Sequence, residues 1–186
     1  NLGIRALEVA DLVLTSTHFN QTRYHAYVPQ AKVAVVGIGF DALARERDLH
    51  NGHDILFYVS PFPHKLTALG IQRLQAWLEQ REDAANIRIH MLGRLPEGTA
   101  LPSAQWIQHG RMPQEKMERI MRDECRAAAY FSAYEGFGMP PVECLRCGLP
   151  CVASDLPPIR ENIPARYLFD NASEDSFIRT LNAVYD

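Results

Sequence analysis

Two glutamates, Glu135 and Glu143, stand on either side of a short segment that is rich in glycine and proline. Gly136 and Gly138 let the backbone approach a ligand closely, and Pro141 is well placed to begin a helix. A helix N-terminus has unpaired N–H groups and a partial positive charge, which together suit a phosphate group. The segment therefore predicts an anion site that has a carboxylate at each end.

The two carboxylates are expected to have a separate binding role, because acids beside a phosphate site would otherwise repel the phosphate. A carboxylate accepts hydrogen bonds from two hydroxyl groups at once, so we expect Glu135 and Glu143 to bind sugar hydroxyls. The alternative interpretation is a structural glycine-proline loop with two solvated acids.

Strand and helix candidates alternate along the chain and predict how this segment is positioned. Apolar runs typical of buried strands occupy residues 11–15, 32–36, 55–59, 87–92, 106–109, 127–131 and 150–153. Helix candidates cover residues 17–27, 66–78, 113–125, a short piece from 141 and a last one from 174, and residues 40–49 form a charged helix or loop. The alternation predicts an α/β fold, a Rossmann-like parallel sheet with helices on both faces. Such sheets bind ligands beyond the carboxyl ends of their strands.

The composition excludes several classes of protein. The chain has 186 residues, 47% of them hydrophobic, which is enough for one globular core. A net charge of -3 without a stripe of Lys and Arg argues against a nucleic-acid partner. No apolar run approaches the roughly 18 residues of a membrane span. The chain starts at Asn1 with no signal-peptide pattern, and we interpret it as a piece of a longer protein.

Three of the four cysteines are spaced as C-x2-C-x3-C, which raises the question of a metal site. The cysteines are Cys125, Cys144, Cys147 and Cys151. Zinc and iron-sulfur sites usually need four ligands, and no further Cys or His pair lies nearby. We therefore expect reduced thiols on a buried helix and strand, as in a cytosolic protein, and no metal ligands.

The segment 135–143, Glu-Gly-Phe-Gly-Met-Pro-Pro-Val-Glu, resembles the E-x7-E motif of retaining glycosyltransferases of the GT-B fold, called group 1. Flanking residues 130–132, 147–155, 158–161 and 167–170 resemble the same family. The resemblance implies that residues 37–186 form the C-terminal domain that binds the nucleotide-sugar donor. It also implies that residues 1–36 are the strand-helix-strand tail of the N-terminal acceptor domain.

The resemblance assigns roles to individual residues. It makes Glu135 and Lys65 the catalytic residues, with Glu135 on the donor sugar and Lys65 on the donor phosphates. It places the ribose hydroxyls on Glu143, and the sugar and diphosphate on the backbone of Gly136, Phe137, Gly138 and Met139. Residues 109–112 resemble the loop that faces the nucleotide base, so Arg111 and Met112 join the donor-binding set.

The chain departs from the family at one position. Group 1 enzymes usually have an arginine just after the strand that matches residues 55–59, and this chain has Pro61 near that place. Arg94 and Arg111, in loops expected on the same side, are the candidates to replace its charge.

The resemblance also implies an activity. The protein would transfer sugar from a UDP- or GDP-sugar to a glycan or lipid-linked acceptor, with retention of configuration, as in polysaccharide biosynthesis. No D-x-D motif is present, so the reaction is expected to need no metal or other cofactor. We expect this piece alone to bind donor without transferring sugar. The longer protein would be cytoplasmic, with peripheral association at the inner face of the inner membrane as one option.

Three alternatives remain open at this point. Residues 33–42 fit a strand followed by G-x-G-x-x-A, the dinucleotide fingerprint of NAD-dependent oxidoreductases. That fingerprint also needs an acid at the end of the next strand, where this chain has Ser60 and Pro61. A nucleotide-sugar-binding module without catalysis and a nucleotide-sugar epimerase of similar fold are the other two.

Overall fold

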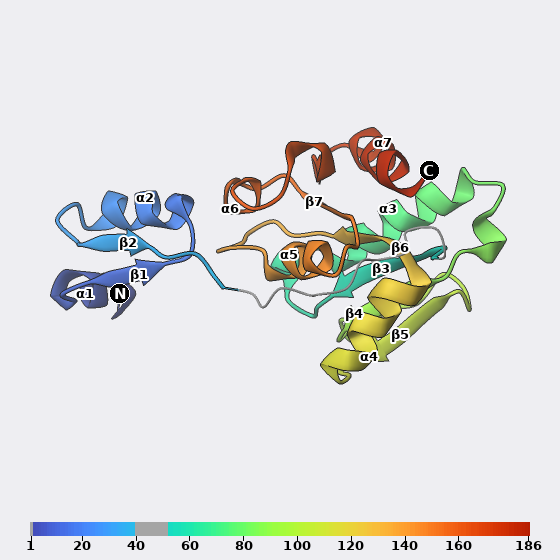
Figure 1. Ribbon diagram of the computed structural model, residues 1–186, viewed down its shortest axis with the longest axis horizontal. Helices are drawn as coiled ribbons and strands as arrows, with labels where there is room; N and C mark the ends of the chain where they lie inside the picture. The colour runs from blue at the N-terminus through green and yellow to red at the C-terminus, as the bar shows by residue number, and fades with distance from the viewer. Residues whose placement is uncertain (1, 40–51) are drawn as a thin grey trace.

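A computed structural model describes residues 2–39 and 52–186, and its main feature is a six-stranded sheet (Figure 1). The strand order is β5-β4-β3-β6-β7-β8, and every neighbouring pair is parallel. The strands are β3 (Asp54–Val59), β4 (Ile89–Gly93), β5 (Trp106–Gly110), β6 (Cys125–Tyr130), β7 (Cys151–Ser154) and β8 (Leu168–Phe169). The predicted Rossmann-like α/β fold is confirmed.

Helices cover both faces of this sheet because alternate residues of a strand point to opposite sides. The helices are α3 (Thr67–Glu79), α4 (Gln114–Arg119), α5 (Met139–Arg146), α6 (Pro157–Arg160) and α7 (Glu174–Tyr185). Ile55 and Phe57 of β3 belong to the core cluster that contains Trp77 of α3 and Phe177 of α7. Leu56, between them, belongs to the cluster on the other face, with residues of α5 and α6.

The N-terminal residues form a unit of their own around a two-stranded parallel sheet (Figure 1). It contains α1 (Leu2–Val9), β1 (Val13–Thr15), α2 (His18–Tyr27) and β2 (Val33–Val35). Thr17 caps α2 by accepting a hydrogen bond from the backbone N–H of Asn20, as expected from the sequence. The expected domain boundary between residues 36 and 37 stays a prediction.

Contacts with the larger sheet fix where this N-terminal unit lies. The backbone N–H groups of His18 and Phe19 donate to the two carboxylate oxygens of Glu161, at 2.8 and 2.7 Å. Glu161 follows α6, so the first turn of α2 meets the loops at the carboxyl edge of the sheet (Figure 1). A carboxylate at a helix N-terminus is stabilising because it satisfies unpaired N–H groups.

Two helices differ from the sequence expectation. Helix α5 begins at Met139 and not at Pro141, because Gly138 takes the left-handed conformation that precedes the first turn. Glu143 therefore lies one full turn inside the helix. The helix expected to reach Cys125 ends at Arg119, and a π-helical turn over Ile120–Glu124 leads into β6. That turn keeps Ile120 and Met121 buried in the core.

Residues 40–49, expected as a charged helix or loop, lie outside the described residues, as does most of the dinucleotide fingerprint after Gly39. In the described parts of the chain, no helix is long and apolar enough to cross a membrane.

Candidate functional site

The strand order reverses between β3 and β6, and this reversal positions the candidate site. β4 and β5 lie on one side of β3, whereas β7 and β8 lie on the other side of β6. The loops that leave β3 and β6 therefore diverge, and ligands of such sheets bind in the crevice between them. The loop after β3 carries Lys65 and the loop after β6 carries Glu135. The fold brings together these two residues, which are 70 positions apart in the chain.

Lys65, Tyr130 and Glu135 form a tight triangle in that crevice. The Lys65 Nζ lies 2.5 Å from Glu135 Oε1 and donates to the Tyr130 hydroxyl oxygen at 2.7 Å. The Tyr130 hydroxyl donates to the same Oε1 at 2.5 Å. Burial, followed by the hydrogen bond to Glu135, raises the pKa of Tyr130, so its hydroxyl keeps its proton. The sequence included Tyr130 only as a flank of the motif and did not single it out.

The backbone next to Lys65 is strained. Leu66, which follows it, has a φ of 48°, in the left-handed region that residues other than glycine rarely occupy. This conformation ends the 3₁₀ turn Pro63–Lys65 and starts α3 directly afterwards. Strain of this kind persists where surrounding contacts hold it.

Glu143 lies in different surroundings, on a pocket of about 450 Å³ between α4 and α5. Met112 and Met139 also line this pocket, and their expected contact with the donor stays a prediction. Burial raises the pKa of Glu143, and the nearby Arg146 acts in the opposite direction. Among the described residues, no side chain or backbone group donates a hydrogen bond to the Glu143 carboxylate. A half-buried carboxylate without donors is a ready acceptor for ligand hydroxyls.

The loop between the two glutamates needs its glycine at position 138. Gly138 has a φ of 89°, and a Cβ there would lie 2.9 Å from Ile159 Cγ1. Pro140 and Pro141 follow inside the first turn of α5 and have no N–H. The helix start therefore offers fewer backbone donors than an ordinary helix N-terminus, and side chains must provide more of the positive charge.

The N-terminal unit holds this loop from outside. Thr17 Oγ1 and Asn20 Nδ2 both donate to the carbonyl oxygen of Gly136, at 3.1 and 2.8 Å. The residue next to Glu135 is thus fixed by two side chains more than a hundred positions earlier in the chain. No sequence pattern marks these two residues as part of the site.

The arginines expected to replace the missing charge, Arg94 and Arg111, form no hydrogen bond or ion pair with Lys65, Glu135 or Glu143 among the described residues. Arg94 and Arg111 are exposed, and neither forms an ion pair with another described residue. Arg111 is also not among the residues that line the Glu143 pocket, whereas Arg146, which the sequence did not single out, does line it. The Arg146 Nε is buried without a hydrogen-bond partner in the described chain, and the Arg146 guanidinium lies 3.5 Å from Glu118.

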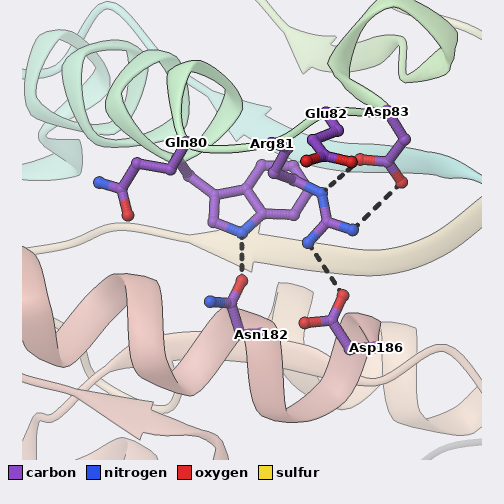
Figure 2. Close-up of a pocket in the computed structure, with 7 residues that line it drawn as sticks. Gln80, Arg81, Glu82, Asp83, Asn182 and Asp186 are labelled. Carbon is purple, nitrogen blue, oxygen red and sulfur yellow. Dashed lines mark hydrogen bonds and ion pairs between the residues drawn. The ribbon is translucent and has the colours of Figure 1, made fainter.

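A second pocket of about 450 Å³ lies at the C-terminal ends of α3 and α7 (Figure 2). Lys65 precedes the opposite end of α3. Figure 2 shows that most of the pocket's polar groups pair with one another, whereas Gln80 and Glu82 are drawn without a bond to the other residues shown. The Arg81 guanidinium bonds to Asp83 and Asp186, and Trp77 Nε1 donates to Asn182 at 2.6 Å. This pocket therefore leaves little unpaired charge for a ligand.

Asp54, His90 and Glu124 form a group of three with the spacing of metal ligands, at the start of β3 and away from Lys65. Arg88 lies 2.7 Å from Asp54 and 3.4 Å from Glu124, so its guanidinium already balances the carboxylates. Although burial opposes ionisation, hydrogen bonds from His90 and Arg88 lower the pKa of Asp54. None of the four cysteines, all within the described residues, forms a disulfide, and three of them are buried. Neither group adds to the candidate site.

Comparison with known proteins places this geometry in a family. The sequence profile described as "Glycosyl transferases group 1" matches residues 63–186, which is most of the chain. The chain belongs to this family. The matched part of this group 1 chain includes Lys65, Tyr130, Glu135 and Glu143. A search among curated proteins finds no match.

Solved glycosyltransferase structures share the fold of this group 1 chain. TarM of S. aureus aligns with a TM-score of 0.79 at 15% identity over 99% of this chain and 38% of its own. HepE of Anabaena, solved with UDP and glucose, aligns with 0.79 at 18% identity over 98% and 56%. The pneumococcal O-GlcNAc transferase GtfA, solved with UDP and GlcNAc, aligns with 0.74 at 15% identity over 100% and 39%. The chain thus spans about half or less of these proteins.

Proposed function

We propose that this chain is the donor-binding part of a glycosyltransferase that uses a UDP- or GDP-sugar. The observation that carries the proposal is the pair of motif glutamates at the strand reversal, one beside Lys65 and one facing an open pocket. A nucleotide sugar has a sugar at one end and a nucleoside at the other, with a diphosphate between them. The two glutamates and the loop between them match that order of groups.

Each part of the donor has a proposed partner. The ribose hydroxyls bind the Glu143 carboxylate, which has no donor among the described residues, and the base lies toward Met112 and the Arg111 loop. The diphosphate lies along the backbone of Gly136, Phe137, Gly138 and Met139, with Lys65 providing positive charge. The sugar hydroxyls bind Glu135. Arg146 also lines this pocket, and its guanidinium is a further positive group near the nucleoside.

The chemical step that we propose is transfer with retention of configuration. The bond between the sugar C1 and the diphosphate oxygen breaks, and a bond from C1 to the acceptor oxygen forms on the same face. The proton of the acceptor hydroxyl passes to the leaving diphosphate, so no protein nucleophile is needed. Lys65 stabilises the charge on the diphosphate as it leaves, in a step that requires no metal. Glu135 positions the sugar.

The acceptor, a glycan or a lipid-linked sugar, would bind to parts of the longer protein that precede this chain. We therefore propose that the isolated chain binds donor but transfers sugar far more slowly than the full-length enzyme. Transfer by the purified chain at rates near those of the full-length enzyme contradicts this part of the proposal.

Thermal unfolding with saturating UDP, GDP or NAD tests the donor class directly. A ligand at about 100 times its Kd stabilises a protein by about 2.7 kcal/mol, which gives a clear shift in Tm. We expect either UDP or GDP to stabilise the chain. Stabilisation by NAD alone would instead support the dinucleotide interpretation, and a full-length protein that binds donor but transfers nothing would be a binding module.

A further inference from the structure

The Tyr130 hydroxyl is the only one of the three groups in the Lys65 triangle that both accepts and donates a hydrogen bond there. It accepts from the Lys65 Nζ and donates to Glu135 Oε1. Glu135 Oε1 thus receives two hydrogen bonds, one from Lys65 and one from Tyr130. None of the described residues donates to its second oxygen, Oε2. The triangle fixes the carboxylate by one oxygen and leaves the other for a ligand.

The charges in the triangle indicate what changes when a diphosphate arrives. An ammonium group has three N–H donors, and two of the Lys65 donors are used within the triangle. A diphosphate carries more negative charge than Glu135 and competes for the same ammonium. When Lys65 turns toward the diphosphate, the hydrogen bond from Tyr130 is the one that remains on Glu135.

Tyr130 is well suited to keep that bond. Its side chain is buried at the end of β6, with the ring packed edge-on against Tyr58 at 6.1 Å between centroids. A buried ring has one position, so its hydroxyl holds Glu135 without the loss of conformational freedom that a long side chain suffers. The raised pKa keeps the hydroxyl protonated, and hence a donor, across the neutral range.

We propose that Tyr130 is a positioning residue, whose hydroxyl holds Glu135 toward the donor sugar while Lys65 binds the diphosphate. This inference rests on the proposed function and goes beyond it. It also explains how a site with Pro61 in place of an arginine keeps Glu135 in position when Lys65 is its only ion-pair partner among the described residues. Tyr130 acts through Glu135 and does not itself contact the reacting atoms.

The test compares Tyr130→Phe with Tyr58→Phe in the full-length protein. Both changes remove one tyrosine hydroxyl from adjacent strands, but the Tyr58 hydroxyl contacts Cys144 and not Lys65 or Glu135. The probes are UDP with UDP-glucose, or GDP with GDP-mannose, whichever pair the wild type binds. We expect Tyr130→Phe to lower kcat by about 10-fold to 100-fold, as for loss of a hydrogen bond to a charged group. We expect the Kd of the nucleoside diphosphate to stay within about twofold of the wild-type value, since Tyr130 is not proposed to contact the nucleotide. Tyr58→Phe should leave both quantities unchanged.

A double-mutant cycle with Glu135→Gln separates positioning from a general structural effect. If Tyr130 acts through Glu135, adding Tyr130→Phe to Glu135→Gln should lower kcat no further. An equal loss of kcat in both backgrounds, or an unchanged kcat in the single variant, overturns the inference while the proposed function stands. A parallel loss of nucleotide affinity in Tyr130→Phe also overturns it. A wild type that binds neither probe pair overturns the proposed function itself, and the inference with it.

Discussion

Glu135 and Glu143 are the same side chain at the two ends of one loop, yet the protein treats them in opposite ways. Glu135 is 10% exposed and receives hydrogen bonds from Lys65 and Tyr130. Glu143 faces an open pocket, has no donor among the described residues and has its pKa raised by burial. Lys65 therefore balances the charge of the Glu135 carboxylate within the protein. Ionised Glu143 instead carries a net desolvation cost, which hydrogen bonds from a ligand can remove.

This difference teaches how one motif serves two purposes. A carboxylate that is already held is oriented before the ligand arrives, which favours precise placement of the reacting sugar. A carboxylate without donors gains most when ligand hydroxyls arrive, because their hydrogen bonds replace lost hydration. The contrast therefore predicts that Glu135 governs the rate and Glu143 governs the affinity.

The largest effect on activity is expected at Glu135, the glutamate that Lys65 and Tyr130 already orient. Glu135→Ala in the full-length protein should lower kcat by about 100-fold to 1000-fold, the range for loss of one preorganised group. The Kd for UDP or GDP should change by no more than about twofold, because the proposal places the donor sugar, and not the nucleotide, on this residue. Steady-state kinetics and calorimetric titration measure the two quantities. A large loss of nucleotide affinity would remove the distinction between the two glutamates.

The next largest effect, on nucleotide affinity, is expected at Glu143, the glutamate that faces the open pocket. Glu143→Ala should weaken UDP or GDP binding by about 10-fold to 100-fold, since hydrogen bonds to a charged group contribute about 1.5–3 kcal/mol. Calorimetric titration of this chain measures the change. In the full-length protein, kcat at saturating donor should stay close to that of the wild type. Unchanged nucleotide affinity shows that Glu143 does not hold the ribose.

A smaller effect on kcat is expected from a change that loosens the loop next to Glu135 and leaves Glu135 itself in place. Asn20→Ala removes one of the two side-chain donors to the Gly136 carbonyl and should lower kcat of the full-length protein about 2-fold to 10-fold. Gln21→Ala is the matched control, because Gln21 donates to Val33 within the N-terminal unit and not to the loop. If both variants lower kcat equally, the loss reflects the N-terminal unit as a whole and not the grip on Gly136.

The smallest effect concerns stability and pH. Because the pKa of Glu143 is raised in the folded protein, the folded state binds that proton more tightly than the unfolded chain does. Ionised Glu143 therefore lowers stability at neutral pH, and Glu143→Gln should raise Tm of the free chain by about 1–3 °C. The gain should vanish below the pKa of an unfolded glutamate, about 4.3, where both states are protonated. Calorimetry of the wild type and Glu143→Gln at pH 7 and pH 4 measures the difference in Tm. If the variant has a lower Tm than the wild type at pH 7, ionised Glu143 does not destabilise the folded chain.

The sequence predicted the fold well wherever the pattern is local. Buried strands such as Ile55 to Val59 are continuous apolar runs, and Thr17 is an ordinary helix cap, so neighbouring residues alone indicate them. The start of α5 was predicted two residues late, because Gly138 takes the left-handed conformation directly before Met139 and the helix therefore begins ahead of both prolines. The roles given to the individual site residues, Arg111 among them, and the domain boundary at residue 37 stay predictions.

The sequence by itself determined the motif at residues 135–143, its spacing and the family to which the chain belongs. These features are local, because the order of residues along one loop is set by the covalent chain. Only the tertiary structure decided that Tyr130 joins Lys65 to Glu135 and that Thr17 and Asn20 hold Gly136. It also decided that no described residue donates a hydrogen bond to the Glu143 carboxylate. These contacts join residues from different strands and units, and their geometry depends on how the sheet reverses its order between β3 and β6.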